Sequence, residues 1–149
     1  RRTGGPRARP GRPGNSAGAN FAGGVVATMT MTQDNHDETV KDGIVLIDFW
    51  AEWCGPCKRF GPVFEKVSEA NEDATFAKVD TEDQQVLAAK YGVRSIPTLV
   101  IYRDGIPLFS QPGALPEATL TSLLKEVREL DMDQAREQYE AQKKEAGRA

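Results

Sequence analysis

The sequence of 149 residues is poor in the residues that build metal centres and disulfide scaffolds, since it has two cysteines and one histidine. Two cysteines form at most one bridge, which excludes the small disulfide-rich scaffolds. One histidine and two cysteines also fall short of the four ligands of a Cys/His zinc site within one chain, so we expect no bound metal. No run approaches the ~18 consecutive apolar residues of a membrane-spanning helix, which excludes a transmembrane protein.

Acidic residues are absent from one end of the chain. Residues 1–24 hold five arginines and no acid, so with a formal charge of −3 for the whole chain the other 125 residues carry −8. This Gly/Pro/Arg-rich arm cannot bury enough surface to offset the entropy of ordering, and we expect it to be disordered, with RNA binding or targeting as the alternatives. It lacks the apolar segment of a secretory signal, and the acidic body repels phosphate. We therefore expect a cytoplasmic protein without a specific nucleic-acid or membrane partner.

Hydrophobic periodicity between residues 25 and 130 predicts alternating strands and helices. The expected strands are 25–31, 44–50, 75–80, 98–102 and 106–109, and the expected helices are 32–40, 57–70, 81–91 and 116–130. A capping box, Thr81-x-x-Gln84, is expected to open the third helix, and Asp104-Gly105 predicts a hairpin turn. This order indicates an α/β fold with a mixed sheet. Residues 131–149 are predicted to be an exposed, charged and partly helical tail without a role in the core.

The motif Trp53-Cys54-Gly55-Pro56-Cys57 lies between a predicted buried strand and a predicted helix. Cysteines three residues apart at a helix start can form a disulfide, and the unpaired N–H groups there favour a thiolate at Cys54. Cys57 lies one turn further in, and we expect it to be more shielded than Cys54. The pattern favours redox chemistry over half of a zinc site or a structural disulfide.

Two further residues interrupt apolar segments. Asp48 falls within the apolar strand, where a buried carboxyl would have a raised pKa and could exchange a proton near neutral pH. The alternative is an Asp that faces solvent. The Ile96–Pro97 bond stands at the start of a strand, and on general frequencies alone it would be trans.

The segment from Asp48 to Lys58, DFWAEWCGPCK, resembles the active-site segment of the thioredoxin family. Further matches in the family's order and spacing are Pro62, residues 77–80, 91–94, 96–99, 104–105 and 113–115, which cover about residues 25–130. The tail is similar to that of some actinobacterial thioredoxins. The resemblance, to bacterial thioredoxins of the actinobacterial type, implies a central mixed five-stranded sheet with two helices on each face and a cis Ile96–Pro97 bond.

The same resemblance implies roles for individual residues. It assigns Cys54 as the nucleophile, Cys57 as the resolving thiol, and Asp48 with the nearby Lys78 as the group that helps to deprotonate Cys57. The surface on which an extended substrate segment lies is formed by Trp53, Gly55, Pro56, Ile96, Pro97 and Gly113. The resemblance implies a monomer that binds no prosthetic group, takes its electrons from a separate thioredoxin reductase and reduces disulfides of cytosolic proteins.

Two residues depart from the family's pattern. His36 stands where the family has a large apolar residue, and we expect it to be partly exposed and to weaken the packing of the first helix. Arg59 adds positive charge beside the site and is a candidate for tuning the choice of partner. Two alternative functions stay open, a disulfide oxidase or isomerase of the same fold and a binding module that uses the same surface without turnover. Gly-Pro between the cysteines resembles the reducing members, because oxidising relatives commonly have a histidine there.

Overall fold

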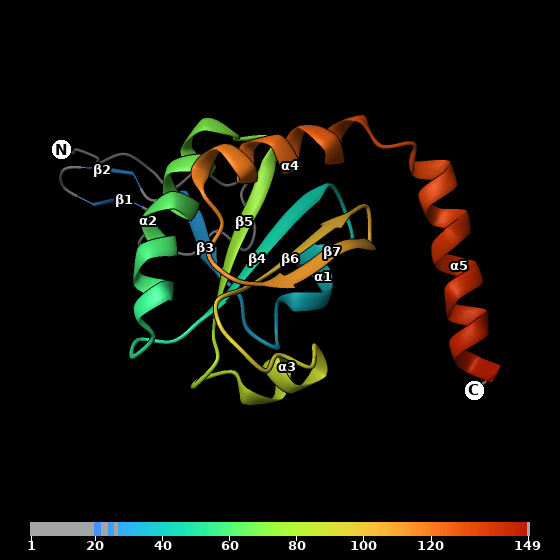
Figure 1. The fold of residues 1–149 in the computed structure, drawn as a ribbon, viewed down its shortest axis with the longest axis horizontal. Coiled ribbons are helices and arrows are strands. Elements are labelled where there is room, and N and C mark those ends of the chain that lie inside the picture. The colour runs from blue at the N-terminus through green and yellow to red at the C-terminus, as the bar shows by residue number, and fades with distance from the viewer. Residues whose placement is uncertain (1–19, 22–23, 26, 149) are drawn as a thin grey trace, which may run out of the picture.

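The computed structural model describes residues 20–21, 24–25 and 27–148 of the chain, and its body is a five-stranded mixed sheet between two layers of helices (Figure 1). The strands lie in the order β3-β5-β4-β6-β7. Their bounds are Thr28–Thr30 for β3, Ile44–Trp50 for β4, Ala74–Asp80 for β5, Thr98–Arg103 for β6 and Ile106–Pro112 for β7. The pairs β3–β5 and β4–β5 are parallel, and the pairs β4–β6 and β6–β7 are antiparallel. The predicted mixed sheet is confirmed.

Helices cover both faces of this sheet. They are α1 (His36–Val40), α2 (Gly55–Ala70), α3 (Gln85–Lys90), α4 (Glu117–Glu129) and α5 (Met132–Arg148). Side chains of β4 alternate between two core clusters, as expected of a central strand that is buried on both faces. Ile47 and Phe49 pack with α1 and α3, whereas Leu46 packs with α2 and α4. The expectation of two helices on each face is confirmed for the four helices α1 to α4.

The hairpin and the cis peptide also follow the expectations. Asp104 and Gly105 connect β6 to β7 with φ angles of 52° and 82°. Two consecutive positive φ values match a turn whose twist suits the flanking strands. The Ile96–Pro97 peptide is cis, as the resemblance implied and against the general frequency of such bonds.

Two helix starts differ from the expectations for one physical reason. The capping box at Thr81 is wrong, because the Thr81 N–H donates to the Trp50 carbonyl at 2.9 Å instead of to Gln84, the Asp80 carboxylate accepts the N–H of Glu82, and α3 begins only at Gln85. The first helix begins at His36 rather than at Thr32, because the side chains of Thr32 and Asn35 bond backbone groups of the turn before it. Polar side chains of this kind compete with the helix for backbone partners. The second helix begins two residues earlier than expected, at Gly55.

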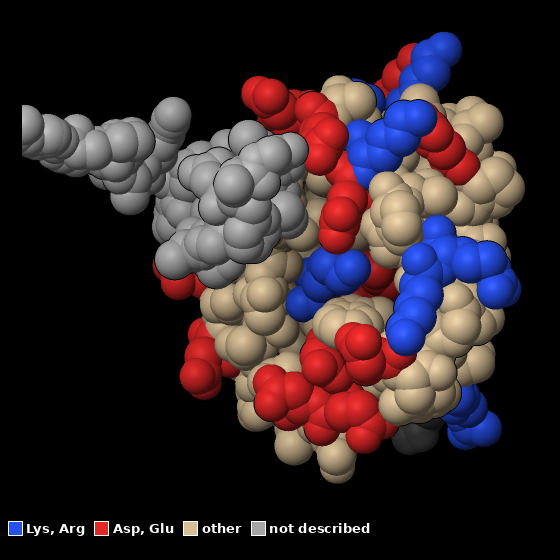
Figure 2. Space-filling view, turned by 90° about the vertical axis from the view of Figure 1, so that its left-hand side faces the viewer, with Lys and Arg blue, Asp and Glu red and all other residues tan. Residues whose placement is uncertain are grey.

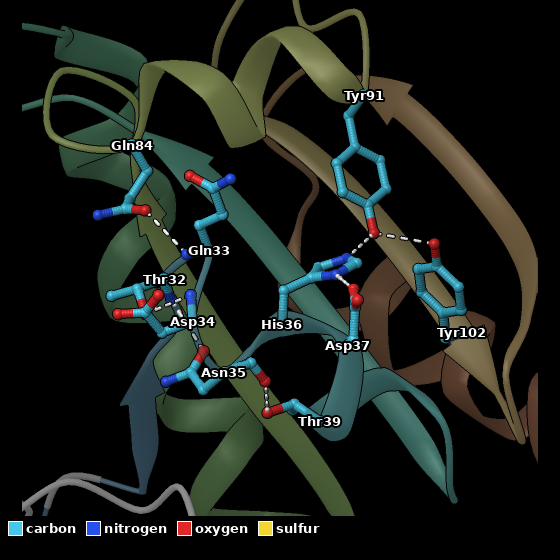
Figure 3. A network of polar contacts seen from close by, with 10 residues as sticks. All are labelled: Thr32, Gln33, Asp34, Asn35, His36, Asp37, Thr39, Gln84, Tyr91 and Tyr102. Carbon is cyan, nitrogen blue, oxygen red and sulfur yellow. Dashed lines mark hydrogen bonds and ion pairs between the residues drawn. The ribbon is translucent and has the colours of Figure 1, made fainter.

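His36 is buried, which corrects the expectation of a partly exposed side chain (Figure 3). Its relative exposure is 5%. Nδ1 donates to the Asp37 carboxylate at 2.7 Å, Nε2 contacts the Tyr91 hydroxyl, and the Tyr91 and Tyr102 hydroxyls are 2.8 Å apart. The ring therefore ties α1 to the end of α3 and to β6 instead of weakening the packing of α1.

The predicted arm, residues 1–24, falls largely outside the described residues. Of the residues described near this end, Asn20–Phe21 (β1) pairs antiparallel with Gly24–Val25 (β2). At the other end the predicted tail is the long helix α5, which Asp131 opens by accepting the N–H of Gln134 at 3.2 Å. Met132, Ala135 and Tyr139 of this helix are half-buried. None of the described helices has the length and apolar character needed to cross a membrane.

Candidate active site

The two cysteines form a disulfide at the N-terminus of α2, at the carboxyl end of β4. Cys54 is the N-cap residue and has extended backbone angles, and its Sγ accepts the N–H of Cys57 at 3.2 Å. Pro56 stands in the first turn, where its missing N–H would have no partner in the helix. The helix therefore presents a backbone donor and the positive end of its dipole to the sulfur of Cys54, which favours a thiolate there once the pair is reduced.

The two cysteines are equally buried. Each has a relative exposure of 4%, so the expected difference in shielding is wrong. The loop that starts at Ile96 contributes to this burial, because Ile96 packs against the cluster of Ala51 and the two cysteines and its carbonyl oxygen lies 3.6 Å from Cys54 Sγ. Position on the helix is the difference that remains, with Cys54 at the cap and Cys57 inside the first turn.

Asp48 lies inside the sheet and lacks a hydrogen bond. Its relative exposure is 1%, and neither carboxylate oxygen has a hydrogen-bond partner. Burial raises the pKa of Asp48 to about 7, partly offset by the positive charge of Lys78. Lys78 is opposite Asp48 in the ladder of β4 with β5, and its Nζ is 3.9 Å from Asp48 Oδ2. The expectation that Asp48 is buried is confirmed, and a carboxyl with this pKa can both take up and release a proton near pH 7.

The Asp48–Lys78 pair lies beneath the helix that carries the cysteines. Asp48 is on the face of β4 that packs on α2, because it alternates with Phe49, whose side chain faces α1 and α3. A Cβ atom at Gly61, four residues after Cys57, would lie 3.6 Å from Lys78 Nζ. The ammonium group also lies 5.3 Å from the centre of the Trp50 ring, a cation–π geometry that the sequence did not suggest.

The residues assigned to the substrate surface come together around the disulfide. Trp53, Gly55, Pro56 and Gly113 are exposed, Ile96 is half-buried and Pro97 is buried. Gly113 has a φ of 112°, a conformation that favours glycine, and its N–H donates to the Pro97 carbonyl at 2.7 Å. This bond joins the end of β7 to the cis-proline loop, so segments far apart in the sequence meet beside Cys54.

Sequence reasoning missed Glu82. The Nε1–H of Trp53 donates to Glu82 Oε2 at 3.0 Å. A signal was available, because parallel neighbouring strands end at the same edge of a sheet and the residues that follow them meet there. Trp50 and Asp80 are partners at the ends of β4 and β5, which places the following residues Trp53 and Glu82 at one edge.

Charged side chains also lie near the dithiol. Lys58 and Arg59 follow Cys57 directly and are both exposed, with Lys58 Nζ 4.0 Å from Glu52 Oε2. Across the described part of the chain, no group of three or more His, Cys, Asp and Glu side chains could hold a metal ion. The arrangement therefore offers a sulfur pair, a proton-exchanging carboxyl and an exposed aromatic ring.

Comparisons with known proteins agree with this geometry. The thioredoxin family matches residues 27–126. The chain is 55% identical over 124 residues to a Streptomyces coelicolor protein named "Putative thioredoxin 2", which covers 83% of this chain and 92% of that one. A Staphylococcus aureus thioredoxin is 40% identical over 100 residues, which is 66% of this chain and 96% of the relative.

Solved structures give the same result. A mutant thioredoxin from Halobacterium salinarum is 38% identical, with a TM-score of 0.64 over 68% of this chain and 91% of the other. The thioredoxin of Malassezia sympodialis is 37% identical, with a TM-score of 0.58 over 65% of this chain and 87% of the other. The family match covers 100 of the 149 residues, and the Cys54–Cys57 pair lies at the start of α2. The chain therefore belongs to the thioredoxin family of thiol–disulfide oxidoreductases.

Proposed function

We propose that this protein reduces disulfides of cytosolic proteins and is itself re-reduced by a separate thioredoxin reductase, as a monomer that binds no prosthetic group. The observation that carries the proposal is the position of the Cys54–Cys57 pair, with Cys54 as the N-cap of α2 and the buried Asp48 beneath that helix. The redox pair uses both cysteines of the sequence, so the fold depends on no structural disulfide that a reducing cytoplasm would break.

The first step uses Cys54. Its thiolate attacks one sulfur of the substrate disulfide, a mixed disulfide with Cys54 forms, and the other substrate sulfur leaves as a thiolate. The N–H of Cys57 and the N-terminus of α2 stabilise the charge on Cys54 before the attack. The substrate segment lies along Trp53, the Ile96–Pro97 loop and Gly113.

The second step uses Cys57. Asp48, with a pKa of about 7, accepts the proton of the Cys57 thiol, and Lys78 stabilises the charge that Asp48 then carries. The Cys57 thiolate attacks the sulfur of Cys54, the Cys54–Cys57 disulfide forms, and the second substrate thiolate is released. The two electrons gained by the substrate equal the two lost by the dithiol.

The roles of the two cysteines are tested by serine variants. We expect Cys54→Ser to abolish reduction of insulin disulfides, because the attacking sulfur is lost. Cys57→Ser retains the first attack and cannot release the substrate, so it accumulates mixed disulfides that non-reducing gel electrophoresis detects. Accumulation with Cys54→Ser in place of Cys57→Ser would reverse the assignment of the two thiols.

The reduction potential of the pair distinguishes a reductase from an oxidase or isomerase. We expect a value near the ~−270 mV of reducing thioredoxins, whereas a value near ~−120 mV would indicate an oxidase. A Cys54→Ser/Cys57→Ser double variant that kept full biological activity would instead indicate a binding module without turnover.

A further inference from the structure

Arg59 lies on α2 at the border of the substrate surface. Its side chain is exposed, and a Cβ atom on Gly55, one turn earlier in the helix, would lie 4.0 Å from Arg59 Nη1. The guanidinium therefore lies over the first turn of α2, in keeping with the lean of helical side chains toward the N-terminus of their helix. Because Gly55 directly follows Cys54, this positive charge stands beside the place where a substrate disulfide is attacked.

The charge of Arg59 is not balanced within the described part of the chain. None of the ion pairs found there includes Arg59, whereas the neighbouring Lys58 has a Glu52 oxygen 4.0 Å away. The guanidinium also lies at the positive end of the α2 dipole, where a cation is unfavourable and an anion is favoured. A carboxylate of a bound partner would relieve both conditions, because it can accept two hydrogen bonds from one guanidinium.

Negative charge borders the substrate surface at a different point. Trp53, directly before Cys54, donates to Glu82, and both Glu82 and the following Asp83 are exposed. Figure 2 views the molecule from the side on which Figure 1 places α2, and it shows acidic side chains gathered at the lower end of this face and basic side chains at its right-hand side. The separation of the two signs favours one orientation of a charged partner over the others.

We propose that Arg59 is a specificity-determining residue that binds a carboxylate of the protein substrate close to the disulfide attacked by Cys54. The preferred substrates are segments with Asp or Glu within a few residues of the attacked cysteine. This inference rests on the proposed reduction of protein disulfides. The competing explanation is that Arg59 stabilises the Cys54 thiolate, in which case it accelerates the reduction of every substrate by the same factor.

The experiment varies the charge on both partners. The substrates are three symmetric disulfides of an end-capped peptide, Ala-X-Gly-Cys-Gly-X-Ala, in which X is Glu, Gln or Lys. The proteins are the wild type, Arg59→Gln, Arg59→Glu and Lys66→Gln. Lys66→Gln is the matched control, because it removes one positive charge from an exposed side chain of the same helix, about two turns further from the cysteines.

The measured quantity is kcat/KM for the Glu peptide divided by kcat/KM for the Lys peptide. We expect this ratio to fall about 3- to 10-fold from the wild type to Arg59→Gln, because an attraction to Glu and a repulsion of Lys are lost together. Arg59→Glu should lower the ratio further, and Lys66→Gln should leave it within about 2-fold of the wild type. Comparing ratios between proteins cancels the intrinsic reactivity of each peptide. In about 1 M NaCl the difference between wild type and Arg59→Gln should largely vanish, because salt screens exposed charges.

Three results would overturn the inference. They are an equal ratio in the wild type and Arg59→Gln, an equal fall in Arg59→Gln and Lys66→Gln, and a loss in Arg59→Gln of the same size on all three peptides. The second result would assign the effect to the net charge of the protein, and the third to the chemistry of the Cys54 thiolate. A wild-type protein that reduces none of the peptides and leaves insulin intact would contradict the proposed function itself.

Discussion

At the scale of single residues, Asp48 has an ionisable group where neither water nor a hydrogen-bond donor reaches it. Lys78 Nζ, at 3.9 Å, supplies a positive charge without a hydrogen bond. Burial is therefore the larger of the two influences, and the pKa of the carboxyl rises to about 7. The carboxyl is a cost to the fold at neutral pH and an advantage to the chemistry of Cys57.

The raised pKa predicts how stability depends on pH. Between about pH 4 and pH 7 the unfolded chain releases the Asp48 proton while the folded chain keeps it, so the free energy of unfolding falls as pH rises. Below this window both states are protonated, and above it both are ionised. Asp48→Asn should therefore gain about 2 to 4 kcal/mol at pH 8 and almost nothing at pH 4. Urea unfolding at both pH values measures this difference.

The same variant tests the role of Asp48 in catalysis. Asp48→Asn cannot accept a proton, so release of the mixed disulfide should slow while the first attack by Cys54 is retained. Stopped-flow reduction of a fluorescently labelled disulfide separates the two steps. A variant that is less stable at pH 8 and turns over normally would show that Asp48 has a structural role and no part in proton exchange.

At the scale of elements, the apolar patterns predicted β4 and α4, whereas the local capping pattern at Thr81 was wrong. The apolar run at 44–50 forms β4 with the expected bounds. A continuous apolar run is typical of a central strand, because helices bury both faces of the sheet at that position. The helix α4 follows its leucine spacing from Pro116 onward. The capping box at Thr81 failed because the Trp50 carbonyl, at the end of another strand, accepts the Thr81 N–H that Gln84 would accept in such a box. No local pattern could reveal that partner.

The roles of His36 and Glu82 could not be predicted from the sequence, because each side chain bonds a partner far away along the chain. The partners of His36, Tyr91 and Tyr102, are 55 and 66 positions further along the chain. The cysteines, Asp48 and the cis-proline loop were recognisable because they belong to contiguous motifs. The partner of Trp53 lies across a sheet edge and required the register of β4 with β5.

The contacts of His36 predict that α1 is fastened by a hydrogen-bonded network. His36→Leu keeps a buried apolar side chain and leaves the Tyr91 hydroxyl with the Tyr102 hydroxyl alone as partner, so we expect a loss of about 1 to 3 kcal/mol. Adding Tyr91→Phe removes the hydroxyl that has lost its bond to the ring, and the double variant should lose less than the sum of the two single losses. Urea unfolding of the oxidised proteins measures all three.

Asp37→Asn is the matched control, since Asp37 bonds the same ring from an exposed position. Its effect should be much smaller than that of His36→Leu, because solvent screens the charge of an exposed carboxylate. Strictly additive losses for His36→Leu and Tyr91→Phe would show that the two side chains do not act as a unit.

At the scale of the whole molecule, α5 contacts the body mainly along β7 and lies far from the dithiol (Figure 1). None of its residues belongs to a core cluster. The end of α4 is closed without it, because Arg103 Nη1 donates to the carbonyls of Val127, Arg128 and Leu130 at 2.8, 3.2 and 3.3 Å. A chain that ends at Leu130 should therefore keep its thermal midpoint within about 3 °C and its activity on insulin.

Leu124→Ala is the contrasting change, because Leu124 is fully buried on α4. It should cost about 2 to 5 kcal/mol in the full chain. If the chain that ends at Leu130 lost as much stability as Leu124→Ala, α5 would have to unfold together with the rest of the domain and contribute to its stability.

The bond from Gly113 to Pro97 also has a consequence for synthesis of the protein in the cell. Cys57 leaves the ribosome 56 residues before Gly113, which is roughly 3 to 11 s at the usual speed of translation. Until Pro97 and Gly113 have both emerged, the two thiols of the nascent chain lack the joined loop that lies beside them in the fold, and we expect them to react as ordinary cysteines. Redox activity therefore depends on residues that emerge only when nearly the whole domain has been made.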